Sequence, residues 1–341
     1  MNVVGRPLSR ARSSALRMLS IAARKHAVPY PKFASTDAVA TRNAPVVAAL
    51  QNSNTAIGEP GGPIIAALPA LSPIQLPGMA RAIEAFFVDT PAGVSEAADC
   101  LWAETRDSCL YVDLEGTKLS RNGSLSLLTI YSPLARRAFV LDVFTLKSVA
   151  FDQTGSRECS IRTILESNRY KKAFFDVRND SDALFYHFGI NLNNVEDIQL
   201  MENATRRDGR RHLLAGLSGC MPQALSPAEK IEWVKSKAAG KALFNPKSGG
   251  ASEVFDVRPL SPEMISYCVG DVYYLPRLRE KHWHKLSKGW RRRVIKESKA
   301  RVLESQQTDY EPHSKDKVKS PWHTDPVDRA GYWPRYLGKS F

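Results

Sequence analysis

Two hydrophobic periodicities alternate along residues 85–287 of this chain. Short apolar runs bounded by polar turns predict strands at 85–88, 108–116, 124–131, 136–143, 171–177 and 194–201. Longer stretches with apolar residues at every third or fourth position predict helices at 90–104, 161–167, 180–190, 227–239 and 261–286. Strands that come first and then alternate with helices indicate an α/β domain in three layers, with a mixed central sheet flanked by helices.

The same pattern divides the chain into three parts. The predicted domain spans residues 83–290. Residues 1–82 are first basic and then rich in Ala, Pro and Gly, which is typical of a disordered leader and linker. Residues 291–341 form a basic C-terminal extension whose aromatic side chains are expected to pack on the domain rather than stack on bases. These aromatic residues are Trp322, Tyr332, Trp333 and Tyr336.

The net charge of +13 is concentrated in two segments. Residues 1–36 contribute +7 without a single acid, and residues 277–301 contribute +9. The rest of the chain is slightly acidic. A basic flank of this kind indicates a polyanionic partner such as nucleic acid, although a solvated helix face would have the same composition.

Several classes of protein are excluded or disfavoured by what the sequence contains. The most apolar stretch, residues 62–80, is interrupted by four prolines and is a poor membrane span. The five cysteines are odd in number and widely spaced, which favours a reducing, intracellular compartment over a disulfide framework. No Gly-rich dinucleotide or P-loop motif follows a strand.

The first candidate for chemistry is the pair Asp113 and Glu115 at the end of an apolar strand. Residues two apart on a strand point to the same face, so the two carboxylates would repel each other there. A hard divalent cation with oxygen ligands, Mg²⁺ or Mn²⁺, would relieve that repulsion. The alternative is that Asp113 and Glu115 belong to the polar face of an edge strand and bind no cation.

Two further acidic segments lie later in the chain. Tyr267 and Asp271 are four residues apart on a predicted helix and therefore share one of its faces. Asp176, Asp180 and Asp182 surround the point at which a buried strand leads into a helix. The alternative for Tyr267 and Asp271 is a pair that faces solvent. The alternative for the second segment is an ordinary acid in the first turn of a helix.

Taken in order, these motifs resemble the DEDD 3′–5′ exonuclease superfamily, tyrosine subclass, which includes ribonuclease D and the Werner exonuclease. The resemblance rests on Asp113 with Glu115, on Asp180, and on Tyr267 with Asp271, and it covers roughly residues 85–287. The segments FFDVRND and HFGI resemble most the Egalitarian-related eukaryotic branch of exonuclease-domain proteins. The resemblance implies a ribonuclease H-like fold.

The resemblance also implies a mechanism and a set of site residues. Asp113, Glu115, Asp180 and Asp271 would hold two Mg²⁺ or Mn²⁺ ions, and Tyr267 would orient or help to deprotonate the attacking water. Nucleoside 5′-monophosphates would leave from the 3′ end of a nucleic acid. The segment after the first motif, with Gly116, Thr117 and Leu119, would meet the terminal nucleotide.

The sequence does not distinguish single-stranded RNA from DNA as the substrate. Residues 277–301, including Arg291, Arg292 and Arg293, are expected to hold the nucleic-acid backbone. The alternative to an enzyme is a catalytically silent RNA-binding adaptor with the same fold. The Arg- and Ser-rich residues 1–30 are compatible with a mitochondrial transit peptide, so the expected location is nucleus, cytoplasm or mitochondrion.

Overall fold

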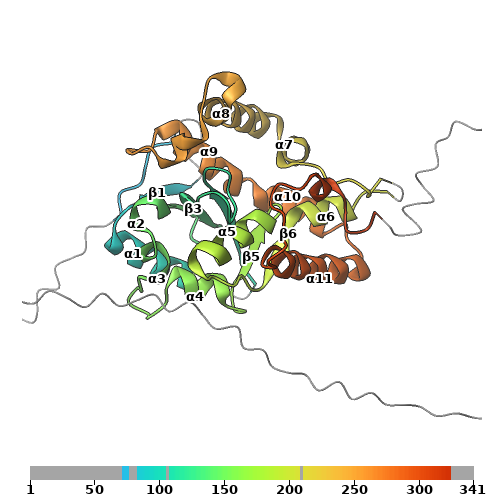
Figure 1. Ribbon diagram of the computed structural model, residues 1–341, viewed down its shortest axis with the longest axis horizontal. Coiled ribbons are helices and arrows are strands. Elements are labelled where there is room, and N and C mark those ends of the chain that lie inside the picture. The colour runs from blue at the N-terminus through green and yellow to red at the C-terminus, as the bar shows by residue number, and fades with distance from the viewer. Residues whose placement is uncertain (1–70, 77–82, 105–106, 208–209, 324–341) are drawn as a thin grey trace, which may run out of the picture. The chain divides into compact units, whose positions relative to one another are not determined.

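A six-stranded mixed sheet lies at the centre of the computed structural model, which describes residues 71–76, 83–104, 107–207 and 210–323 (Figure 1). The strands are β1 (Glu84–Val88), β2 (Cys109–Glu115), β3 (Leu127–Ser132), β4 (Arg137–Asp142), β5 (Lys171–Phe174) and β6 (Val195–Asp197). Their order in the sheet is β1-β4-β3-β2-β5-β6. Strand β3 pairs antiparallel with β2 and β4, and the other pairs are parallel.

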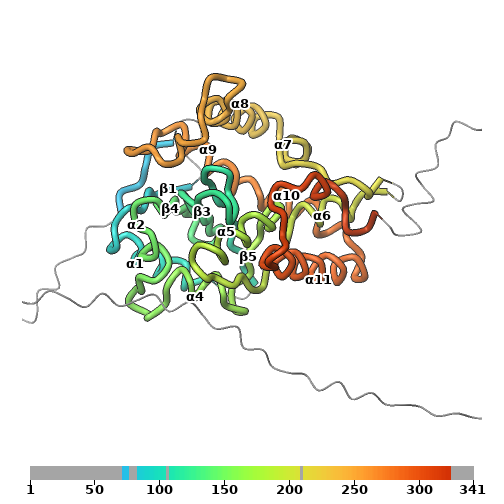
Figure 2. Tube along the Cα trace, viewed as in Figure 1, coloured from blue at the N-terminus to red at the C-terminus, as the bar shows by residue number. Residues whose placement is uncertain are grey.

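Helices cover both faces of this sheet. One face packs against α1 (Pro91–Trp102), α3 (Val149–Asp152), α4 (Ile161–Glu166) and α5 (Arg178–Phe188). The other packs against α6 (Ile198–Ala204), α7 (Leu217–Cys220), α9 (Pro262–Tyr273) and α10 (Leu275–Trp283). The short α2 (Val143–Leu146) follows β4, and α8 (Pro227–Phe244) lies on the outer side of α9 (Figure 2). This is the predicted three-layer arrangement.

The alternation of side chains along β2 determines which of its residues point to each face of the sheet. Leu110, Val112 and Leu114 enter the core shared with α1, α4 and α5. Tyr111 enters the core on the opposite face, which contains α9. Because side chains alternate along a strand, Asp113 and Glu115 also belong to the face with α9. The sheet therefore presents both carboxylates to the helix that carries the third motif.

Several element boundaries differ from the prediction. Helix α5 begins at Arg178, two residues earlier than expected. Strand β6 ends at Asp197, whose side chain accepts a hydrogen bond from the backbone N–H of Gln199 and so starts α6 where a strand was expected. The helix expected at 261–286 is divided into α9 and α10, with Pro276 in the first turn of α10, where its missing N–H costs nothing. Helix α8 extends to Phe244.

The last long helix, α11 (Lys288–Ser305), crosses the position at which the domain was expected to end, residue 290. It packs against α5, α6 and β6, and its inner side includes the buried residues Val294 and Val302. Beyond it, Trp322 is buried and forms an edge-to-face contact with Trp290, so it packs on the domain as predicted. Tyr332, Trp333 and Tyr336 lie outside the described residues.

Most of the predicted leader and linker, residues 1–70 and 77–82, also lies outside the described residues. In the described stretch 71–76, Ile74 forms an antiparallel bridge with Ala85 at the start of β1, and Leu76 is buried. This stretch therefore packs on the domain instead of serving as a linker. Among the helices that the structure describes, none is both long and apolar enough to span a membrane.

Candidate active site

The first and third motifs meet where β2 ends beneath α9. Ser261 caps α9 through a hydrogen bond from the backbone N–H of Met264, and Pro262 occupies the first turn. The residue at which α9 begins determines which of its side chains face the sheet. Tyr267 and Asp271, one turn apart, are both buried on that side. Carboxylate oxygens of Asp113, Glu115 and Asp271 lie within 4.8 Å of one another. The spacing of the residues in the sequence had predicted which faces they share, and the fold joins those faces.

The second motif contributes three acids, which the structure distinguishes by their partners. Asp176 forms two hydrogen bonds with Arg178, at 2.6 and 2.7 Å. Asp182 accepts hydrogen bonds from the backbone N–H and the Nε of Arg121, at 2.7 and 2.6 Å. Asp180, in the first turn of α5, has a buried Oδ1 without a partner among the described residues. Asp180 is therefore the acid of this motif that is left available to a cation.

The four acids Asp113, Glu115, Asp180 and Asp271 are called the active-site acids below. Asp180 of α5 is not among the three acids whose oxygens lie within 4.8 Å of one another, but burial and then the charge of Asp113 raise its pKa.

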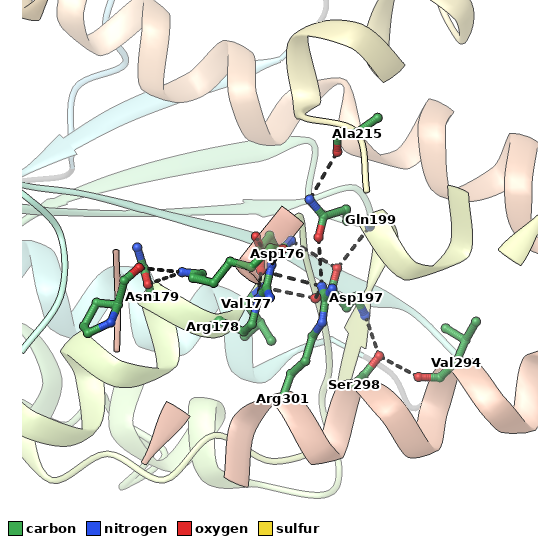
Figure 3. A network of polar contacts seen from close by, with 12 residues as sticks. Asp176, Val177, Arg178, Asn179, Asp197, Gln199, Ala215, Val294, Ser298 and Arg301 are labelled. Carbon is green, nitrogen blue, oxygen red and sulfur yellow. Dashed lines mark hydrogen bonds and ion pairs between the residues drawn. The ribbon is translucent and has the colours of Figure 1, made fainter. Parts of the chain in front are cut away.

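A second set of acids, called the arginine-paired acids, lies on the α11 side of the molecule and consists of Asp176, Asp182 and Asp197. Asp197 is fully buried and accepts a hydrogen bond of 2.6 Å from Nη1 of Arg301 on α11 (Figure 3). Nη1 of Arg301 also lies 3.6 Å from Asp176. Arginine side chains neutralise these acids, and Asp176 and Asp197 connect the ends of β5 and β6 to Arg301 of α11.

Lys237 of α8 is a site residue that no sequence motif predicts. Its Nζ donates a hydrogen bond of 2.9 Å to the hydroxyl of Tyr267 and forms an ion pair with Oδ2 of Asp271. The helix that carries it was predicted only as far as residue 239, without a position in the fold. The available signal was a stripe at helical spacing, in which Lys237 lies between Trp233 and Gly240.

Burial raises the pKa of every active-site acid, and repulsion between carboxylates adds to this for Asp113, Glu115 and Asp180. Burial, followed by the charge of Asp271, raises the pKa of Asp113 to about 7. Burial and the charge of Asp113 raise the pKa values of Glu115 and of Asp180. Burial also raises the pKa of Asp271, against the opposing effect of Lys237. The ammonium group of Lys237 offsets these effects only in part, and carboxyls with this electrostatic signature are candidates for metal binding and catalysis.

These residues fit a hard divalent cation. The donor set consists of carboxylate oxygens, which Mg²⁺ and Mn²⁺ prefer. Within the part of the chain that the structure describes, Oδ1 of Asp180 and Oδ1 of Asp271 are buried without a hydrogen-bond partner. A buried polar atom of this kind costs folding free energy unless a ligand satisfies it. A cation beside these oxygens would both satisfy them and reduce the repulsion within the cluster.

The residues expected to contact the terminal nucleotide follow β2 directly. A Cβ on Gly116 would lie 2.2 Å from the backbone oxygen of Ser124, so this glycine is needed for the close approach of two chain segments. Thr117 donates a hydrogen bond from its Oγ1 to the backbone oxygen of Ser252, and Leu119 packs against the core of the α1 face. All three lie next to the active-site acids in the chain and also have structural roles.

The three arginines expected to hold the nucleic-acid backbone lie near the start of α11. Arg291 donates a hydrogen bond to the backbone oxygen of Trp283 and lies over its ring, and Arg293 lies over the ring of Trp290. Arg292 is exposed. Helix α11 packs against β6, α5 and α6, whereas the active-site acids come from β2, α5 and α9. Helix α5 is therefore the element that both contributes an active-site acid and packs against α11.

Comparison with known proteins gives a family and a fold. A family model described as 3′–5′ exonuclease matches residues 86–287, which is more than half of the chain. Among curated proteins, the chain is similar to the piRNA biogenesis protein EXD1 of Mus musculus (28% identical over 179 residues) and of Homo sapiens (29% over 178 residues). Each alignment covers 51% of this chain, but only 29% of the mouse protein and 32% of the human protein.

Among solved structures, the chain is similar to the RNase D of Trypanosoma brucei. The complex of that protein with RNA U12 matches with a TM-score of 0.55 at 20% identity, covering 73% of this chain and 77% of that chain. The structure described as RNase D alone matches with a TM-score of 0.53 at 22% identity, covering 73% of this chain and 80% of that chain. The likeness confirms the fold that the motif order had predicted.

Proposed function

Because the chain belongs to the 3′–5′ exonuclease family, we propose that it hydrolyses phosphodiester bonds from the 3′ end of single-stranded nucleic acid and releases nucleoside 5′-monophosphates. The observation that carries this proposal is the convergence of Asp113, Glu115 and Asp271 within 4.8 Å, from segments more than 150 residues apart in the chain. Asp180 supports it through a buried oxygen that lacks a partner among the described residues.

Asp113, Glu115, Asp180 and Asp271 would hold two divalent ions, Mg²⁺ or Mn²⁺. Bound there, the ions would supply Lewis-acid activation of the attacking water and stabilisation of the departing 3′-oxygen. The protein's own contribution is to hold Asp113, Glu115 and Asp271 together against their repulsion, because β2 and α9 pack directly on each other.

Tyr267 would orient the attacking water. Burial and the charges of the surrounding carboxylates raise the pKa of Tyr267, so its side chain stays a neutral phenol at neutral pH. A neutral phenol positions a water through hydrogen bonds but does not remove its proton. Of the two roles predicted for this residue, orientation is therefore the one that its surroundings favour.

Single-stranded RNA is the first substrate to test, because the names of the similar proteins refer to piRNA biogenesis and to RNase D. Arg291, Arg292 and Arg293, with the other basic residues of α10 and α11, would contact phosphates outside the reacting centre. Gly116, Thr117 and Leu119 remain the proposed contacts of the terminal nucleotide.

A second candidate function is RNA binding without catalysis. The ion pair between Lys237 and Asp271 favours it, because an ammonium group already neutralises one carboxylate that a metal ion would require. In that case the fold would bind a 3′ end and leave it intact.

A 5′-labelled strand distinguishes the two functions. The full chain with Mn²⁺ or Mg²⁺ is expected to shorten labelled RNA or DNA stepwise, and EDTA is expected to stop the shortening. Asp113→Asn is expected to slow it by about a thousandfold or more, since an amide is a poor ligand for these ions. Asp152→Asn, at an exposed position of α3, is the matched control and should retain activity. Binding to both nucleic acids without shortening under either metal would favour the adaptor.

A further inference from the structure

Helix α8 is fixed against α9 by a stripe of residues that faces the active site. The stripe contains the buried Trp233 and Gly240 and, one turn after Gly240, Phe244. The centres of the Phe244 and Tyr267 rings lie 5.4 Å apart. A Cβ on Gly240 would lie 2.4 Å from the Cβ of Tyr267, so only glycine allows this approach. Lys237 belongs to the same stripe. Its backbone is therefore held at one position relative to Tyr267.

The ammonium group of Lys237 is also fixed. It lies 4.1 Å from the centre of the Tyr267 ring, donates to the hydroxyl of that tyrosine, and pairs with Oδ2 of Asp271. The Asp271 side chain is only 4% exposed and that of Lys237 17% exposed, so water screens this pair weakly. The ammonium group of Lys237 is therefore a fixed part of the site.

Asp271 divides its two oxygens between different surroundings. Oδ2 faces Lys237, whereas Oδ1 is buried and has no partner among the described residues. The charge of Lys237 also lowers the pKa values of Asp113 and Glu115, against the larger effect of burial. One ammonium thus acts on three of the four active-site acids and leaves Oδ1 available.

We infer that Lys237 is a built-in counter-charge that holds Asp271 and Tyr267 in place without metal and weakens the binding of divalent cations by the active-site acids. This inference rests on the metal-dependent function proposed above. A divalent cation that approaches Asp271 meets a like charge already paired with the same carboxylate, and the repulsion between them reduces the affinity. Lys237 is therefore a positioning residue that also determines the metal concentration the protein requires.

The test compares Mn²⁺ binding by four forms of the full chain, using isothermal titration calorimetry. Lys237→Gln keeps a hydrogen-bond donor but removes the charge, and it is expected to bind Mn²⁺ about tenfold more tightly than the unchanged chain. Lys237→Arg keeps the charge and should retain the original affinity. Lys241→Gln, at an exposed position one turn further along α8, is the matched control and should also retain it.

Thermal unfolding gives a second readout that does not depend on activity. Without metal, Lys237→Gln is expected to unfold at a lower temperature, because Asp271 loses its partner and the carboxylates repel each other more strongly. With saturating Mn²⁺ the difference should shrink or reverse. If Lys237 served only in packing, Lys237→Gln would bind Mn²⁺ more weakly than the unchanged chain, because a disordered site binds metal more weakly.

The outcomes separate this inference from the proposed function. Equal or weaker Mn²⁺ affinity in Lys237→Gln would overturn the inference, while the metal-dependent nuclease could still stand on its own assay. Binding by Lys237→Gln but not by the unchanged chain would support the inference and show that Lys237 closes the site to metal. The absence of binding in all four forms would overturn both the metal site and the counter-charge.

Discussion

The active-site acids and the arginine-paired acids are the same type of residue in opposite electrostatic surroundings. Both sets combine acids at the ends of strands of one sheet with acids on the helices packed against it. The arginine-paired acids are neutralised within the protein, as Asp197 is by Arg301 at 2.6 Å. The active-site acids have only Lys237 as a close cationic partner among the described residues, through Asp271. One set completes the fold, and the other leaves room for a ligand.

The pKa values of one acid from each set show this division. Burial opposes the ionised form of Asp176 as it does that of Asp113, but the hydrogen bonds from Arg178 and the charge of Arg301 lower the pKa of Asp176. Burial and neighbouring carboxylates instead raise the pKa of Asp113 to about 7. The comparison teaches that a buried acid is a candidate for function when its counter-charge is missing, and not because it is buried.

The largest expected effect on stability is that of replacing Asp197. In Asp197→Ala, the buried guanidinium of Arg301 would lose its 2.6 Å partner, and the backbone N–H groups of Asp176, Val177 and Gln199 would lose an acceptor. Removing one partner of a buried ion pair costs about 3–5 kcal/mol. Urea unfolding of the metal-free protein measures this loss.

Asp113→Asn is the contrasting variant in that experiment. It removes a repelling charge, so the free energy of unfolding without metal is expected to stay the same or to increase. If Asp113→Asn and Asp197→Ala destabilised the protein equally, the distinction between the two sets of acids would be wrong.

The pH dependence of stability is the next largest expected difference. The pKa of Asp113 rises from 3.8 in the unfolded chain to about 7 in the fold, so the folded state binds the extra proton between these values. The stability that this proton provides is present below pH 3.8 and is lost as the pH rises through about 7. Metal-free protein should therefore lose part of its stability between pH 5 and pH 7.5, as measured by thermal unfolding in EDTA.

Two comparisons isolate that effect. In Asp113→Asn the loss of stability between pH 5 and pH 7.5 should be smaller. The buried His282 acts in the opposite direction, because burial lowers its pKa to about 4, so its contribution is lost as the pH falls from 6.5 through 4. The difference between variant and unchanged chain removes this shared contribution, and identical pH profiles would contradict the raised pKa of Asp113.

The smallest expected effect concerns a hydroxyl that supports the arginine-paired acids. The Oγ of Ser298 accepts a hydrogen bond from the backbone N–H of Asp197 and donates one to the backbone oxygen of Val294 (Figure 3). Ser298→Ala should cost about 1 kcal/mol in urea unfolding, because one buried N–H loses its acceptor. Ser248→Ala, at an exposed position, should change stability less, and equal effects would show that the hydroxyl has no special role.

The parts of the site that the sequence could predict are those determined by local periodicity. Strand alternation places Asp113 and Glu115 on one face, and helical spacing places Tyr267 above Asp271. The antiparallel strands β2, β3 and β4 follow from short connections between apolar runs, and they were predicted correctly.

The parts that could not be predicted depend on partners far away in the sequence. Asp176, Asp180 and Asp182 look alike as sequence, and only Arg121, Arg178 and Arg301 distinguish them. Lys237 comes from a region without a recognised motif, and its role depends on the close packing of α8 on α9. The expected end of the domain at residue 290 followed from composition, since α11 is so basic that its buried side was not apparent.

Helix α11 determines how fragments of this protein should be designed. The match to the exonuclease family ends at residue 287, one residue before α11 begins. A fragment cut at that point would contain Asp197 without Arg301 and Ser298, and a strand β6 without the helix that packs on it. Its inactivity would reflect a damaged support for the sheet and would say nothing about nuclease chemistry. The smallest fragment suited to testing catalysis therefore extends at least to Trp322, which covers Trp290 of this helix.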